Sequence, residues 1–328
     1  MTENALNQLK TFTTIVADSS DLSAIETFRP LDATTNPSLI TAAANQATNI
    51  ALIESAVQQA QAEGLNDQAL IERSIDILTV KFGVEILKLI EGRVSTEVDA
   101  ALSYDTAATI RKAKELLALY ADYGIASDRI LIKIAATWEG IQAAKALEAE
   151  GIHTNLTLLF GIPQAHACAA AQVTLISPFV GRILDWYKKA EGVTAYPIEK
   201  DPGVLSVKAI YQFYKAYGIK TEIMGASFRS VDQVLALAGC DLLTVAPNLL
   251  ADLAQDQRVV TAQLGSTVNL ASDVFAPLDE DRFKHDLSQD PMASELLHSG
   301  IEGFIKAREQ LAAKLSSQFL AQNDTLKI

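Results

Sequence analysis

Eight short apolar segments, each followed by a longer helical pattern, constrain the fold of this chain most strongly. Several are apolar almost throughout, as parallel strands buried on both faces should be. We expect strands at Thr14–Ala17, Leu31–Thr34, Val94–Val98, Ile130–Ala135, Thr154–Leu159, Leu175–Val180, Glu222–Gly225 and Leu242–Ala246. Eight alternating strand–helix units predict an α/β protein, a single (β/α)8 TIM barrel that forms one domain over residues 1–328.

The chain is longer than a barrel requires. Its 328 residues exceed the ~250 of a typical barrel, which predicts additional N-terminal, inserted and C-terminal helices. The gap from Pro37 to Arg93 fits two helices rather than one, and from Asp279 onward the pattern indicates helices packed on the outside, with Phe304 and Leu311 among the apolar positions. An open doubly wound sheet is the alternative. It is disfavoured because no glycine-rich loop follows the first strand.

Local sequence marks the ends of three helices. Asn36-Pro37 is typical of an N-cap followed by a first-turn proline. Asp105 is expected to begin a helix that Gly124 ends, and Ser230-Val-Asp-Gln233 has the spacing of a capping box.

Charge and cysteine content exclude several classes of function. The 27 basic and 40 acidic residues give a net charge of −13, which is unfavourable for binding nucleic acid or an anionic membrane surface. Cys168 and Cys240 have no CxxC neighbour, so they are expected to be small buried hydrophobes. No secretory signal and no apolar run of ~18 residues is found. We expect a soluble cytoplasmic protein with neither nucleic acid nor membrane as a partner.

Lys133 interrupts the β-branched strand Ile130–Ala135. A lysine at a strand end can simply reach solvent or pair with an acid. If it is buried instead, desolvation favours the neutral amine, which could attack a carbonyl and form a Schiff base.

Further polar or aromatic side chains lie at two-residue spacing within the strands, or directly after them, so that they can face the interior. The C-terminal ends of barrel strands converge on one mouth, where such side chains would meet. The set comprises Asp18, Asn36, Ser95, Glu97, Asn155, Thr157, Ser177 and Phe179. So many at one mouth favour a functional site over separate structural roles.

Some of these residues also have local explanations. Asn36 could only cap the next helix, and Asp18 could only bond to nearby amides. Glu97 or Asp99 could pair with a cation such as Arg93.

Two arginines, Arg182 and Arg229, each follow a strand through a turn of small residues. Alone they would be surface charges. Together at successive barrel loops they suggest a phosphate clamp, because the guanidinium fork matches phosphate oxygens. The four histidines lack metal-ligand spacing, so we expect no metal and no other cofactor. An amine, carboxylates and arginines together suggest carbon–carbon chemistry through an iminium.

The same segments resemble transaldolases of the pentose phosphate pathway, specifically the long-chain type among the class I Schiff-base aldolases. The resemblance rests on six motifs in the expected order, namely Asp32-Ala-Thr-Thr-Asn-Pro-Ser38, Val94-Ser-Thr-Glu-Val-Asp99, Ile130-Leu-Ile-Lys133, Asn155-Leu-Thr-Leu-Leu-Phe160, Ser177-Pro-Phe-Val-Gly-Arg182 and Met224-Gly-Ala-Ser-Phe-Arg229. It implies transfer of a dihydroxyacetone unit from sedoheptulose 7-phosphate to glyceraldehyde 3-phosphate, giving erythrose 4-phosphate and fructose 6-phosphate. It also implies a homodimer.

The resemblance assigns roles to the matching residues. Lys133 would be the Schiff-base nucleophile, and Glu97 would relay protons through a water held by Thr157. Asp18 would take the proton from the hydroxyl next to the scissile bond. The residues implied for substrate binding are Asn36, Ser95, Asn155, Ser177, Phe179, Arg182, Ser227 and Arg229.

Phe179 bears on whether the enzyme transfers or merely cleaves. Related fructose 6-phosphate aldolases have a tyrosine there, whose hydroxyl can protonate the carbanion, so Phe179 favours transfer. A lyase that releases free dihydroxyacetone and a non-catalytic sugar-phosphate-binding barrel remain as alternatives.

Overall fold

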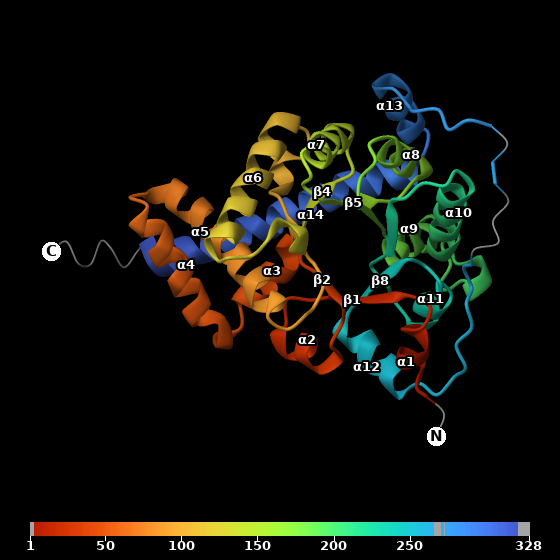
Figure 1. Ribbon diagram of the computed structural model, residues 1–328, viewed down its shortest axis with the longest axis horizontal. Coiled ribbons are helices and arrows are strands. Elements are labelled where there is room, and N and C mark those ends of the chain that lie inside the picture. The colour runs from red at the N-terminus through yellow and green to blue at the C-terminus, as the bar shows by residue number, and fades with distance from the viewer. Residues whose placement is uncertain (1–2, 266–269, 272, 321–328) are drawn as a thin grey trace.

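A computed structural model of the chain describes residues 3–265, 270–271 and 273–320. Its eight strands form one closed barrel in sequential order, with every neighbouring pair parallel (Figure 1). The strands are β1 Thr14–Asp18, β2 Asp32–Thr34, β3 Val94–Glu97, β4 Ile130–Ala135, β5 Thr154–Leu159, β6 Leu175–Pro178, β7 Glu222–Gly225 and β8 Leu242–Val245. The predicted (β/α)8 barrel is confirmed.

The largest difference among the strand ends is in β6, which stops at Pro178 rather than at Val180. Proline has no N–H to donate to the ladder, so the strand cannot continue regularly through it. Phe179 instead makes an isolated bridge to Ala226 and is the N-cap residue of the next helix.

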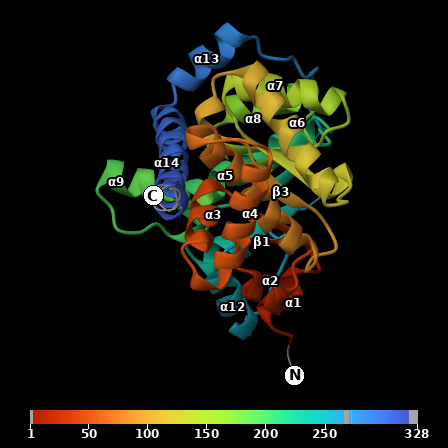
Figure 2. The ribbon, with the colours of Figure 1, turned by 90° about the vertical axis from the view of Figure 1, so that its left-hand side faces the viewer.

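Helices surround the barrel (Figures 1 and 2). They are α1 Ala5–Leu9, α2 Leu22–Phe28, α3 Pro37–Ala44, α4 Ile50–Ala62, α5 Asp67–Leu87, α6 Thr106–Asp122, α7 Trp138–Ala149, α8 Ile162–Ala170, α9 Val180–Glu191, α10 Pro202–Ala216, α11 Val231–Leu235, α12 Pro247–Gln255, α13 Glu280–Ser288 and α14 Pro291–Leu315. Within the described ranges, none of them is both long and apolar enough to cross a membrane.

The prediction of two helices between Pro37 and Arg93 is wrong, because three α-helices, α3 to α5, occupy this segment. The polar residues after α3 explain the extra break. Asn49 donates its side-chain amide to the carbonyl of Ala43, and Lys314 donates to that of Ala44. These bonds satisfy carbonyls that the end of a helix leaves unpaired.

The predicted helix caps are confirmed at two of the three places. The side chain of Asn36 accepts from the N–H of Leu39 at 2.9 Å, and α6 has Asp105 as its N-cap. Gly124, which follows α6, has a φ of +73° that favours glycine. The third cap is only half a capping box. Ser230 accepts from the N–H of Gln233, but the Gln233 side chain accepts from the N–H of Arg229 instead of returning to Ser230.

The barrel interior is layered. Its middle is filled by an apolar cluster of Val16, Leu131, Leu175, Met224 and Leu242. At the N-terminal ends of the strands, an arginine that precedes β3 pairs with acids that begin β2 and β7. These are Arg93, Asp32 and Glu222. Polar side chains that face the interior beyond the apolar layer are therefore at the C-terminal mouth.

The C-terminal helix α14 crosses the whole molecule, from the side of α4 and α5 to that of α8 and α13 (Figure 1). Phe304 and Leu311, predicted as apolar helix positions, are buried. The prediction of helices packed on the outside did not include a contribution to the mouth, but α14 also brings Phe304 to the cavity there. A segment remote in sequence thus helps to shape the mouth.

The contact between α5 and α6 provides a test of the fold. Gly83 lies against the hydroxyl of Tyr120, which is fully buried and hydrogen-bonded to Thr96 at 2.6 Å. A methyl group at Gly83 would overlap this hydroxyl, so we expect Gly83→Ala to destabilise the protein by about 1–3 kcal/mol in urea unfolding.

Gly303 is the matched control. It lies on the exposed face of α14, with open space where a Cβ would be, so Gly303→Ala should stabilise the protein by up to about 1 kcal/mol. Equal stability of the two alanine variants would contradict the described packing of α5 on α6.

Candidate active site

Strand register places Lys133 between two other predicted site residues. Glu97 is its partner on β3, and Asn155 is its partner on β5. The Lys133 and Glu97 side chains are 5% and 3% exposed, and Nζ lies 3.1 Å from Oε2 of Glu97. Nζ also donates to the carbonyl oxygen of Thr35 at 3.1 Å. Lys133 is therefore a buried amine and not a strand-end lysine that reaches solvent.

Two buried oxygens beside this amine have no hydrogen-bond partner among the described residues. They are Oε2 of Glu97, which meets Nζ of Lys133 at ion-pair distance but without hydrogen-bond geometry, and Oγ1 of Thr157. Burial raises the pKa of Glu97, while the nearby charge of Lys133 opposes this effect. Glu97 can therefore hold a proton more readily than an exposed glutamate can.

Asp18 ends β1 and lies in register with Thr34 on β2. Its side chain accepts from Oγ1 of Thr34 at 3.1 Å, and no backbone amide of the described residues donates to it. Burial raises the pKa of Asp18, opposed by Lys133, by the Thr34 hydrogen bond and by Arg182. These contacts place a second perturbed carboxyl group at the mouth.

Three small polar residues form a hydrogen-bonded line across the interior. The amide of Asn155 donates to Oγ of Ser95 at 3.0 Å, and the hydroxyl of Ser177 donates to Oδ1 of Asn155 at 2.6 Å. All three side chains are buried. The line fixes the amide beside Lys133.

The two predicted clamp arginines lie close enough to influence each other. Burial lowers the pKa of Arg182, and the charge of Arg229 lowers it further. The Arg182 guanidinium is 5.0 Å from the ring centre of Phe179 and 5.6 Å from that of Phe304. The guanidinium group is thus in contact with two aromatic rings.

Arg229 is held by Asp185 and Ser227. Its Nε and Nη2 are both 2.9 Å from Oδ2 of Asp185, and its Nη1 is 3.4 Å from Oγ of Ser227. A side chain at Gly181 would overlap the carbonyl of Ser227 and crowd Arg229, so glycine is required for this close approach.

A cavity of about 180 Å³ opens at the mouth. It is lined by predicted site residues, namely Asp18, Asn36, Lys133, Ser177, Phe179, Arg182, Ser227 and Arg229. The other predicted residues, Ser95, Glu97, Asn155 and Thr157, are buried on β3 and β5, the strands that flank Lys133 on β4. The structure therefore brings all the candidates together.

Sequence reasoning missed several lining residues, among them Thr34, Thr244 and Phe304. The two threonines lie on strand positions that face the interior, so the same two-residue periodicity could have identified them. Phe304 had no such signal, because only the tertiary path of α14 brings it there.

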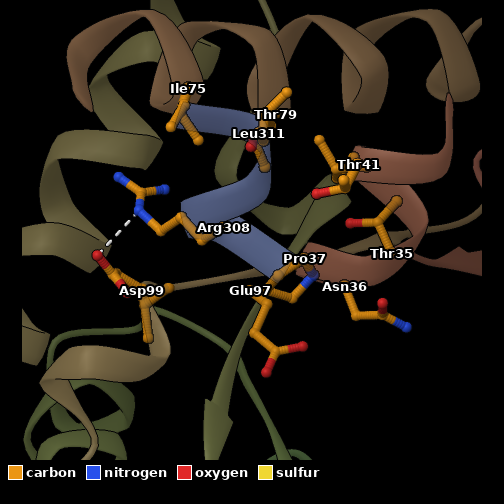
Figure 3. A pocket seen from close by; sticks show the side chains of 12 residues that line it. Thr35, Asn36, Pro37, Thr41, Ile75, Thr79, Glu97, Asp99, Arg308 and Leu311 are labelled. Atoms are coloured by element: carbon orange, nitrogen blue, oxygen red, sulfur yellow. Dashed lines mark ion pairs between the residues drawn. The ribbon is translucent and has the colours of Figure 1, made fainter. Parts of the chain in front are cut away.

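Behind Glu97 lies a second, small cavity of about 20 Å³, between the ends of β2 and β3 and helix α14 (Figure 3). Arg308 crosses its edge and pairs with Asp99 at 2.9 Å and with Asp76 at 3.1 Å. The suggestion that Glu97 or Asp99 pairs with a cation is confirmed, but the cation is not Arg93, which pairs with Asp32 and Glu222. Glu97 forms an ion pair with Lys133, and Asp99 forms one with Arg308.

Both cysteines are buried and free, as predicted. Burial raises the pKa of Cys240 to about 12, so its thiol is unreactive at neutral pH. Within the described part of the chain, no cluster of three or more His, Cys, Asp or Glu side chains is arranged to hold a metal ion.

Comparison with known proteins confirms the resemblance found in the motifs. The sequence model of the transaldolase/fructose-6-phosphate aldolase family matches residues 15–315. A transaldolase of Thermosynechococcus vestitus is 53% identical over 312 residues, which cover 94% of this chain and 80% of that protein. A transaldolase of Nostoc sp. is 51% identical over 322 residues, covering 97% of each chain.

A third relative, a transaldolase of Methylococcus capsulatus, is 50% identical over 326 residues, or 97% of this chain and 98% of that one. The similarity thus extends over the barrel strands, the inserted helices and α14 alike. On this evidence the chain belongs to the transaldolase/fructose-6-phosphate aldolase family.

Proposed function

We propose that this chain is a transaldolase that moves a dihydroxyacetone unit from sedoheptulose 7-phosphate to glyceraldehyde 3-phosphate. The products are erythrose 4-phosphate and fructose 6-phosphate, and the unit is carried as a Schiff base on Lys133. The observation that carries the proposal is the buried amine of Lys133, 3.1 Å from Glu97, below a mouth that also holds Asp18 and two arginines.

The first step is formation of the imine. Nζ of Lys133 attacks the ketose carbonyl carbon, and the resulting carbinolamine loses its hydroxyl as water. Glu97 is placed to move the protons that this step requires, and its raised pKa suits a group that alternates between acid and base. The unpartnered oxygens of Glu97 and Thr157 offer two hydrogen-bond partners to a relaying water.

Asp18 acts in the second step. It takes the proton from the hydroxyl next to the scissile bond, the carbon–carbon bond breaks, and its electrons pass into the iminium to give an enamine and a free aldehyde. The same events in reverse join the enamine to an acceptor aldehyde: a new carbon–carbon bond forms, and Asp18 returns the proton to the aldehyde oxygen. Phe179 has no hydroxyl to protonate the enamine, which favours waiting for an acceptor over release of dihydroxyacetone.

The remaining candidates bind substrate. Asn36, Asn155 and Ser177 are assigned to hydroxyls of the three-carbon unit, and Ser95 supports Asn155 through their hydrogen bond. Arg182 and Arg229, together with Ser227 in the turn after β7, are assigned to the distal phosphate.

The proposal extends to the cellular location and the oligomeric state of the enzyme. Two free, buried cysteines suit the reducing cytoplasm. The resemblance also supports a homodimer. Sedimentation of the purified protein tests the dimer directly.

Borohydride trapping tests the nucleophile. With fructose 6-phosphate, reduction should label Lys133 irreversibly, because the imine becomes a stable secondary amine. The label should be mapped by peptide mass spectrometry and should vanish in Lys133→Ala. Labelling at another lysine, or none at all in the unaltered enzyme, would remove the mechanism. Lys145→Ala, on helix α7, is a control that should label normally.

Replacing Asp18 separates imine formation from bond cleavage. Asp18→Asn keeps an oxygen that can accept from Thr34 but cannot take a proton as a carboxylate does. We expect borohydride to trap the imine as before, while turnover falls about 100-fold or more. Undiminished turnover would exclude Asp18 as the base.

The same variant predicts a gain in stability. Because burial raises the pKa of Asp18 above its unfolded value, the ionised carboxylate disfavours folding at neutral pH. That penalty disappears as the pH falls through the folded pKa towards the unfolded one. Asp18→Asn should therefore be more stable than the unaltered protein near neutral pH, and the difference should shrink on acidification.

Urea unfolding across this pH range measures the difference. Glu54→Gln, at an exposed position within α4, is the control and should show no such gain. A stability gain in Asp18→Asn that grows on acidification would contradict the cause given for the shift.

The clamp is tested by comparing substrates. Arg182→Ala or Arg229→Ala should raise KM for phosphorylated sugars about 10- to 100-fold, the range expected for lost charged hydrogen bonds, while sparing unphosphorylated donors. Arg73→Ala, on the surface of α5, serves as the control. Equal losses with both kinds of substrate would refute the assignment.

A further inference from the structure

Two threonines that no step above uses meet beside Asp18. Thr34 is on β2 and Thr244 on β8, the two strands that flank β1 in the barrel. Their hydroxyl oxygens are 2.8 Å apart, and Oγ1 of Thr34 is 3.1 Å from Oδ1 of Asp18. The two threonine side chains are 2% and 3% exposed. The hydroxyls therefore form a water-shielded chain that ends on the carboxyl group.

The hydroxyl protons available determine the direction of the hydrogen bonds from Thr244 through Thr34 to Asp18. Each hydroxyl has one proton to donate, and an ionised carboxylate can only accept. When Asp18 is ionised, the Thr34 hydroxyl donates its hydrogen bond to Oδ1, so that towards Thr244 it can only accept a hydrogen bond. When Asp18 gains a proton, Thr34 can turn its own towards the carbonyl of Ala17, 3.5 Å away, or towards Thr244. The chain thus accommodates both states of Asp18 and favours the ionised one.

Other charged groups around Asp18 act differently. Lys133 on β4 and Arg182 on α9 favour its ionised form, whereas Glu97 on β3 opposes it. Charge attraction has no fixed direction, so these groups do not determine how the carboxyl plane is turned. The hydrogen bond from Thr34 does, because it engages Oδ1. No residue in the described ranges donates a hydrogen bond to Oδ2, which is left for the cavity.

We propose that Thr34, held in place by Thr244, is the positioning residue of Asp18: its hydroxyl anchors Oδ1 and presents Oδ2 to the substrate hydroxyl as the base. The assignment rests on the proposed function and adds two residues to it. Neither threonine touches the reacting atoms. Both act through Asp18.

Thr34→Val removes the donor with little change of shape. We expect borohydride still to trap the imine on Lys133, while turnover falls about tenfold or more, as for a lost charged hydrogen bond. The acidic limb of kcat/KM against pH should also move to higher pH, since an Asp18 carboxylate without its donor binds a proton more tightly. Thr34→Ser, which keeps the hydroxyl, should restore both the rate and the pH profile.

Thr244→Val provides a second test, which also serves if Thr34→Val does not fold. It should shift the profile in the same direction but less, because Thr34 can still donate to Asp18. The double valine variant should be little worse than Thr34→Val alone, since both changes break one chain.

Thr96→Val is the matched control. Thr96 is another buried strand threonine in a hydroxyl pair, with Tyr120, but it lies outside the cavity. It should lose stability and keep its pH profile. If Thr34→Val traps the imine with an unmoved acidic limb, or if Thr34→Ser fails equally, the positioning role is wrong. Absence of trapping in the unaltered enzyme would instead overturn the proposed function.

Discussion

The site depends on one buried ion pair, between Lys133 and Glu97. Removing two charges from water costs several kcal/mol for each ion, and their attraction offsets this cost only when geometry is good. Here the barrel supplies the geometry, because parallel pairing of β3 and β4 puts the two residues opposite each other. The arrangement therefore holds the proposed nucleophile and its proposed partner in proton transfer 3.1 Å apart.

The layered interior explains why the chemistry is confined to one end. A cluster of five apolar side chains separates the ion pairs of Arg93, at the N-terminal ends of the strands, from the polar groups at the mouth. The polar groups above that layer line the mouth cavity or, in the case of Glu97, the small cavity behind it. Desolvation is accordingly the largest influence on the pKa of both Asp18 and Glu97. The apolar layer thus contributes to catalysis by excluding water.

Eight alternating strand–helix units were sufficient to predict the barrel, and two-residue spacing within the strands predicted which polar side chains share the interior face. Thr34 and Thr244 were not predicted as site residues, because threonine is common in strands and needs no special explanation there. Phe304 could not be predicted, because α14 reaches the mouth only through tertiary packing. The end of β6 was misplaced because the apolar run continues past Pro178, while the missing N–H stops the ladder.

The proposed phosphate clamp would resolve an apparent conflict between the net charge of −13 and an anionic substrate. Arg182 is partly desolvated in contact with two aromatic rings and is repelled by Arg229, so the pair is electrostatically unfavourable on its own. Asp185 relieves this only weakly, since that ion pair is about half exposed and water screens it. A phosphate between the two guanidinium groups would neutralise both at short range. Attraction within the cavity, and not the field of the whole protein, then determines where a sugar phosphate binds.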